Sequence, residues 1–118
     1  MKPHIFGIYD CLGDVHIQFG SRGTYPVKDS YEIEITAYND RHMVRQRLGI
    51  SYSSHYDNPY TWDIRDSSQN QLDCGHCLEG DIVGIVDKFL DCNNIADKTD
   101  VLKIIDNYVK KGVIDIWN

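Results

Sequence analysis

The sequence lacks the segments that carry a protein to or through a membrane. A membrane-spanning helix needs roughly 18 consecutive apolar residues, and no such run occurs. Residues 1–7 have neither an apolar core nor a cleavage site, so they predict the start of a strand rather than a signal peptide. Without an export signal, the four cysteines are expected to be free thiols in a reducing cytoplasm.

The sequence is also poor in clustered cations and in catalytic motifs. The net charge is −6, and the one cationic cluster consists of Arg41, Arg45 and Arg47. Because binding to a phosphate backbone needs clustered lysine and arginine, we expect neither DNA nor RNA as a ligand. There is no glycine-rich phosphate loop, nucleophile elbow or HExxH motif. We therefore expect no enzymatic activity and no cofactor.

What the sequence does contain is enough apolar material for one ordinary core. Of its 118 residues, 42% are hydrophobic and 11% are aromatic, which is typical of a folded globular protein. Proline is scarce, and no repeat or low-complexity linker divides the chain. We therefore expect residues 1–118 to form a single domain.

The first half of the sequence predicts strands. Residues 4–10 and 14–19 are short alternating runs that predict a hairpin, and residues 20–26 have the composition of a loop. In residues 31–38, Ile33 and Ile35 point to one side while Glu32 and Glu34 point to the other, and this strand could lie at a sheet edge that pairs with a partner. A fourth strand over residues 43–52 would pair its arginines with these glutamates, and residues 62–65 predict a fifth.

The second half changes to a helical period. Apolar residues form one stripe in residues 81–91, with Asp81 as N-cap, and a second stripe in residues 99–111, with Thr99 as cap. Residues 113–117 alternate and could add a final strand. This order predicts an α+β fold, in which a mainly antiparallel sheet from the N-terminal half is packed by two C-terminal helices.

The motif that most resembles an active site is Cys74-Gly75-His76-Cys77. It matches the active-site sequence of protein disulfide isomerases, but only 41 residues follow it and no proline occurs after Pro59, so the rest of that fold is missing. One CxxC pair also falls short of the four ligands of a structural zinc site. The favoured interpretation is two cysteines in a turn that leads into a helix. A thiol–disulfide or zinc function centred on these cysteines, or a reversible bridge between them, stays open as the alternative.

Acidic residues are concentrated between residues 57 and 97. This stretch has nine carboxylates against two cations, Arg65 and Lys88, a net charge of −7 that exceeds the charge of the whole chain. A one-sided negative field attracts basic partners and repels polyanions. Tyrosines and a tryptophan lie among the first of these acids, and such aromatics often anchor protein interfaces. The residues we predict to bind a partner are Tyr56, Asp57, Tyr60, Trp62, Asp63, Asp66 and Asp73.

In size, acidity and order of elements, the chain resembles the immunity proteins of bacterial toxin systems, such as those of contact-dependent growth inhibition. The resemblance implies that the chain binds a cognate basic toxin, frequently a nuclease, in the cytoplasm and occludes its active site. No residue of that group can be carried over, because its members differ in fold. An acidic mimic of DNA that inhibits a nucleic-acid enzyme of phage defence would share the same electrostatics.

Overall fold

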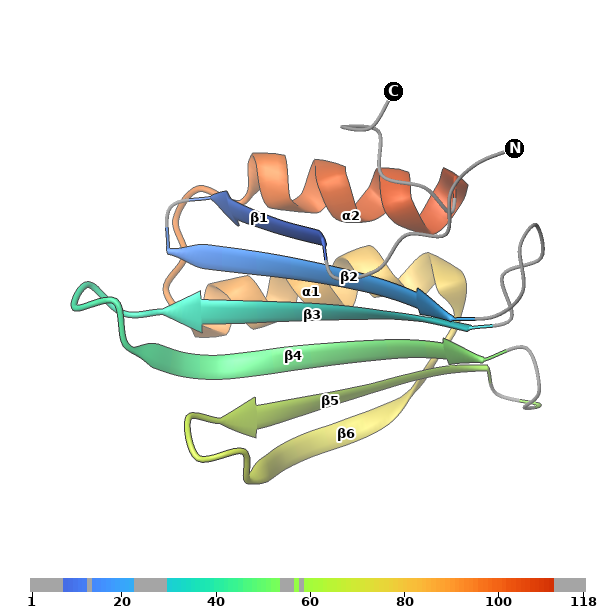
Figure 1. Ribbon diagram of the computed structural model, residues 1–118, viewed down its shortest axis with the longest axis horizontal. Helices are drawn as coiled ribbons and strands as arrows, with labels where there is room; N and C mark the ends of the chain where they lie inside the picture. The colour runs from blue at the N-terminus through green and yellow to red at the C-terminus, as the bar shows by residue number, and fades with distance from the viewer. Residues whose placement is uncertain (1–7, 13, 23–29, 54–56, 58, 112–118) are drawn as a thin grey trace.

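The structure of this chain is a computed structural model that describes residues 8–12, 14–22, 30–53, 57 and 59–111. A six-stranded sheet precedes two helices, which is the α+β arrangement that the sequence predicts (Figure 1). The strands are β1 (Ile8–Leu12), β2 (Val15–Arg22), β3 (Ser30–Tyr38), β4 (Val44–Ser53), β5 (Tyr60–Asp66) and β6 (Gln71–Cys77). A 3-10 turn, η1 (Glu79–Asp81), leads into α1 (Ile82–Cys92), and α2 (Thr99–Lys111) follows.

The sheet is an antiparallel meander in which each strand pairs with the next one along the chain. The central strand β3 pairs with β2 on one side and β4 on the other. The expectation that residues 31–38 could form an edge is therefore wrong. The outer strands are β1 and β6, and each pairs on one side within the sheet.

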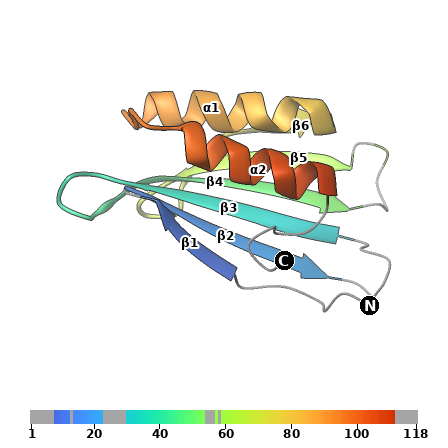
Figure 2. The ribbon, with the colours of Figure 1, turned by 90° about the horizontal axis from the view of Figure 1, so that it is seen from above.

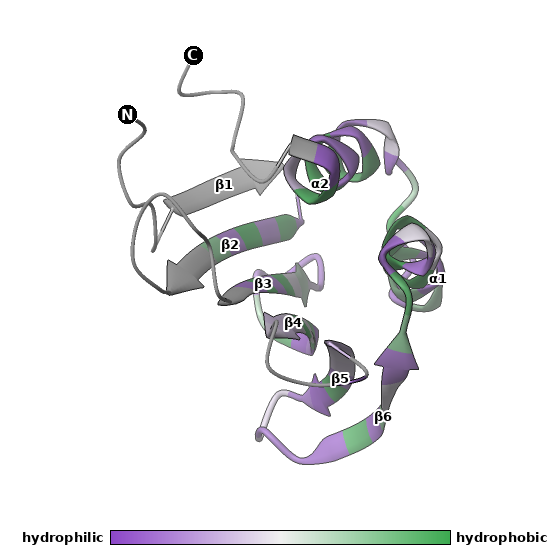
Figure 3. Ribbon diagram, turned by 90° about the vertical axis from the view of Figure 1, so that its right-hand side faces the viewer, coloured by the Kyte–Doolittle hydropathy of each residue, from purple (hydrophilic) through white to green (hydrophobic). Residues whose placement is uncertain are grey.

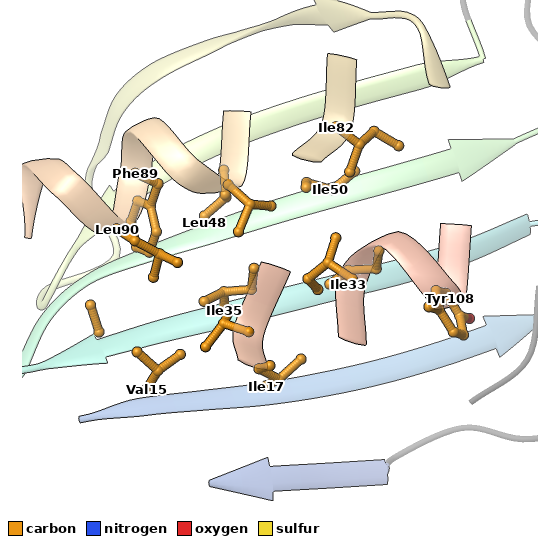
Figure 4. Packing of buried hydrophobic residues seen from close by; sticks show 14 of the residues in the cluster. Val15, Ile17, Ile33, Ile35, Leu48, Ile50, Ile82, Phe89, Leu90 and Tyr108 are labelled. Atoms are coloured by element: carbon orange, nitrogen blue, oxygen red, sulfur yellow. The ribbon is translucent and has the colours of Figure 1, made fainter. Parts of the chain in front are cut away.

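Both helices lie on the same face of the sheet, which curves around them (Figures 2 and 3). The alternation in β3 sets this face, because Ile33 and Ile35 are fully buried while Glu32 on the other face is exposed. Register places Ile35 between Ile17 and Leu48, so one buried row crosses three strands. Phe89 and Leu90 of α1 and Tyr108 of α2 belong to the same core (Figure 4).

The helices begin and end close to the residues that the apolar period predicts. Asp81 directly precedes α1, but its carboxylate accepts the Leu78 N–H (3.1 Å) and makes no hydrogen bond with the first turn of α1. Helix α2 has the predicted bounds, and the carbonyl of Lys98 accepts the first helical hydrogen bond, from the Leu102 N–H (2.9 Å). Thr99 is therefore the first helical residue rather than the cap.

Three local expectations differ from the structure. Residues 20–22 continue β2 instead of forming a loop. The strand expected over residues 43–52 extends to residue 53, and the strand expected over residues 62–65 already begins at residue 60. Residues 74–77, expected as a turn, form the last four residues of strand β6. The turn that begins at Asp66 returns these residues alongside β5, and that pairing outweighs their weak strand propensity. The suggested final strand, residues 113–117, lies outside the described residues.

Candidate partner-binding surface

The predicted aromatic anchors of β5 face the helices rather than open solvent. Tyr60 and Trp62 are half-buried and pack against the core. The Tyr60 ring lies beside that of Tyr52 on β4, with ring centroids 4.8 Å apart, and its hydroxyl donates a hydrogen bond to Glu79 Oε2 (3.2 Å). This bond links the start of β5 to η1, so Tyr60 helps to hold the start of the helical layer against the sheet.

Trp62 lies across the backbone of β6. A Cβ atom placed on Gly75 would come within 2.9 Å of Trp62 Cζ2 and within 3.0 Å of Cε2 and Nε1. The indole can approach this closely because Gly75, its register partner, has no side chain. Glycine at this position therefore lets one aromatic ring cover the edge strand from the helix side.

Asp63 lies on the opposite face of the sheet, within a network of ion pairs. Arg65 Nε is 3.3 Å from Asp63 Oδ2, and Arg65 Nη2 is 3.3 Å from Glu34 Oε2. Arg47 Nε is 3.9 Å from Glu34 Oε1, so the expected pairing of an arginine of residues 43–52 with a glutamate of residues 31–38 is present. Half-exposed pairs of this kind contribute about 0–1 kcal/mol each. Because of this pairing, the carboxylate of Asp63 already has a cationic partner within the chain.

Asp66 closes the turn between β5 and β6. Its Oδ1 accepts hydrogen bonds from the backbone N–H groups of Ser68 (2.8 Å) and Asn70 (2.9 Å), and its Oδ2 accepts one from Asn70 Nδ2 (3.2 Å). The backbone N–H of Asn70 is the main reason that the pKa of Asp66 lies below its usual value. Gln69 in this turn has a φ of 69°. The Asp66 carboxylate thus stabilises this turn in addition to carrying a negative charge.

The remaining predicted residues do not join a single patch. Asp57 is exposed in the connection between β4 and β5, and Tyr56 lies outside the described residues. Asp73 is exposed on β6, and its Oδ1 accepts the backbone N–H of Cys74 (2.9 Å). The aromatic rings and Asp63 are therefore on opposite faces. The alternation of a strand separates residues that are adjacent in sequence.

Three exposed carboxylates follow one another in sequence along β6 and η1. We call this surface, with Asp73, Glu79 and Asp81, the acidic edge. The sequence has no lysine or arginine between residues 66 and 87, and among the described residues no cation forms an ion pair with these three acids. The sequence pattern does not single out Glu79 or Asp81 as binding residues, because it assigns Asp81 to a helix cap. The signal that identifies them in the sequence is the absence of cations from this stretch.

Two other acids of the same stretch share one cation of the chain. Lys98 Nζ lies 2.6 Å from Asp87 Oδ1 and 2.7 Å from Asp91 Oδ1 of α1, and these hydrogen bonds raise the pKa of Lys98. Asp63, Asp87 and Asp91 therefore have cationic partners within the chain, whereas Asp73, Glu79 and Asp81 of the acidic edge have none among the described residues.

The two cysteines of the CGHC sequence lie in a paired strand and not at a helix N-terminus. Cys74 is exposed in register with Asp63, whereas Cys77 packs against the core in register with Tyr60. Three residues of strand span about 10 Å, while bridged cysteines need Cα atoms within about 7 Å. A bridge between them would require β6 to rearrange. Burial, followed by the charge of Asp81, raises the pKa of the Cys77 thiol.

The cysteine environment does not match the one that activates a thiol. Reactive thiols have lowered pKa values, usually beside a cation or at a helix N-terminus, whereas the pKa of Cys77 is raised. Within the part of the chain that the structure describes, no three histidine, cysteine or acidic side chains are grouped so that they could hold a metal ion. The same part contains no helix long and apolar enough to span a membrane.

Comparison of the chain with protein-family models, with curated proteins and with solved structures gave no match.

Proposed function

We propose that this chain is an inhibitor of the immunity type, which binds a basic toxin, such as a nuclease, in the cytoplasm and covers its active site. The observation that carries the proposal is the acidic edge, whose three exposed carboxylates have no cation paired with them among the described residues. Uncompensated negative charge on one side of a small protein steers a basic partner into contact.

In the proposed complex, carboxylates of the acidic edge take the place of substrate phosphates. Asp73 and Glu79 would pair with the lysines and arginines that a nuclease uses to bind its substrate backbone. Asp57 is exposed at the β4–β5 end of the molecule and would extend this contact. We expect an interface of ordinary size, about 1,600 Å² in total, and an association rate that falls steeply with salt.

The test is a comparison of two charge reversals of equal size. The tagged chain is used to capture a basic protein from cells of its source, and that protein is then purified for binding measurements. Asp73→Lys/Glu79→Lys changes the acidic edge, and Asp97→Lys/Asp100→Lys makes the same charge change at exposed positions around the start of α2. We expect the first pair to weaken binding by at least about tenfold more than the second.

Two results would contradict the proposal. If both pairs weakened binding equally, the effect would come from net charge and not from the acidic edge. If the protein captured were acidic, the electrostatic mechanism itself would be excluded. Inhibition of the captured protein's activity at one equivalent of the chain is the functional readout.

A further inference from the structure

The outer side of β6 offers backbone hydrogen-bonding groups to a partner strand. In an antiparallel ladder, successive residues turn their N–H and C=O groups alternately to one neighbour and to the other. The Cys74 N–H donates to the carboxylate of Asp73 (2.9 Å), which places Cys74 among the residues that face away from β5. Register is regular from the Asp63–Cys74 pair to the Tyr60–Cys77 pair, so His76 faces the same free side.

This edge has few of the devices that usually prevent strand addition. Natural edge strands are commonly protected by lysine, by proline or by a bulge. Strand β6 contains neither lysine nor proline, and its register shift lies at its beginning, opposite Ile64 and Arg65. Two of the large exposed apolar side chains belong to the same surface, Leu72 (52% exposed) in β6 and Leu78 (74% exposed) directly after it. The last four residues of β6 therefore present a regular and accessible edge.

The negative charges beside β6 determine which kind of strand could pair with its free edge. A second copy of the chain would bring two sets of Asp73, Glu79 and Asp81 together, and like charges on paired strands are destabilising. A basic strand would instead place its cations against these carboxylates. Asp73 would exchange its hydrogen bond from the Cys74 N–H for an ion pair with the incoming lysine or arginine, which frees that N–H for the partner's backbone.

We propose that the partner of this chain adds an extended, basic strand to the free edge of β6, with backbone hydrogen bonds to Cys74 and His76. Main-chain bonds of this kind supply affinity, and alternate side chains supply specificity. The proposal rests on the proposed function, since it names the way in which the acidic edge would contact a basic toxin.

The probe is a short synthetic peptide that alternates lysine and threonine, titrated into the isotopically labelled full chain. Amide shifts in the NMR spectrum should change at Cys74 and His76, and a matched peptide with glutamate in place of lysine should not bind. His76→Pro removes one outward donor without removing a bond to β5, because edge strands tolerate proline where the N–H faces solvent. We expect it to weaken peptide binding by at least about tenfold, and the matched control His76→Ala by less than about twofold.

A second variant distinguishes unfolding of the protein from loss of strand pairing at β6. Asp73→Lys/Glu79→Lys keeps every backbone N–H and should abolish binding of the lysine peptide, while the circular dichroism spectra of all variants should match the original. Equal peptide affinity for His76→Pro and His76→Ala would overturn the proposal. So would shifts that map to the helices or to the opposite sheet face, or the absence of binding.

The captured basic protein distinguishes this inference from the function on which it rests. If that protein binds His76→Pro as tightly as His76→Ala, the edge is not its contact, and the proposed function stands without it. If the chain captures no basic protein, the proposed function fails whatever the peptide does. If the chain formed a concentration-dependent dimer that His76→Pro abolished, the strand that pairs with β6 would come from a second copy. That result would overturn the proposal that a basic strand of a partner binds there.

Discussion

Replacing Gly75 by alanine tests whether the Trp62 ring truly lies on the edge strand. The new methyl group would meet three atoms of the indole at 2.9–3.0 Å, which is closer than real Cβ contacts come. Forcing such a contact into packed structure costs about 1–3 kcal/mol, and the lower backbone entropy of alanine in the unfolded chain offsets about 0.4–1 kcal/mol of it. We therefore expect the free energy of unfolding to fall by about 1–2 kcal/mol.

The assay is urea unfolding followed by the fluorescence of a single tryptophan. The chain has two tryptophans, so Trp117→Phe leaves Trp62 as the reporter. A loss of this size lowers the urea midpoint by roughly 0.5–1 M. The emission of Trp62 in the folded state should also shift, because the ring must move away from β6.

The matched control is the same substitution at Gly84. This glycine is exposed within α1, and a Cβ placed there has nothing within 4 Å. Alanine is better than glycine in a helix interior by about 1 kcal/mol, so Gly84→Ala should stabilise the protein. The two variants should change stability in opposite directions. A Gly75→Ala protein as stable as the original, with unchanged Trp62 emission, would refute the placement of the ring.

Three further predictions concern titrating groups. Hydrogen bonds lower the pKa of Asp66 in the folded state, so their stabilisation is present above about pH 4 and is lost as the pH falls through the folded pKa. Urea unfolding should show a weaker acid dependence in Asp66→Asn. Burial raises the pKa of Tyr108 to about 12, so stability should decline as the pH rises from about 10 towards 12, and Tyr108→Phe should flatten that decline. In a thiol titration at pH 8, Cys74→Ser should remove a fast-reacting equivalent and Cys77→Ser should not, because the Cys77 thiol is partly buried with a raised pKa. Equal rates for both would show that β6 does not hold the two side chains in different environments.

The elements that the sequence predicts well are those whose pattern is complete within the element itself. In α2, apolar residues recur with the helical period between Thr99 and Lys111, and the structure has the same bounds. In β3, strict alternation around Ile33 and Ile35 is enough to place the strand and to choose its buried face. Both patterns record burial along one continuous segment, so no knowledge of other segments is needed.

Two features depend on residues that are distant in sequence or lie on other elements. They are the formation of strand β6 and the pairing of each carboxylate with a cation. Gln71–Cys77 has no apolar alternation, and it becomes a strand because the Asp66 turn returns it to β5 and Trp62 packs over Gly75. Composition alone shows that residues 57–97 are acidic. Which of those carboxylates have a cationic partner depends on Arg65, which pairs with Asp63, and on Lys98, which pairs with both Asp87 and Asp91. Charge is a property of each residue, whereas its compensation depends on three-dimensional distance, and only the tertiary structure sets that distance.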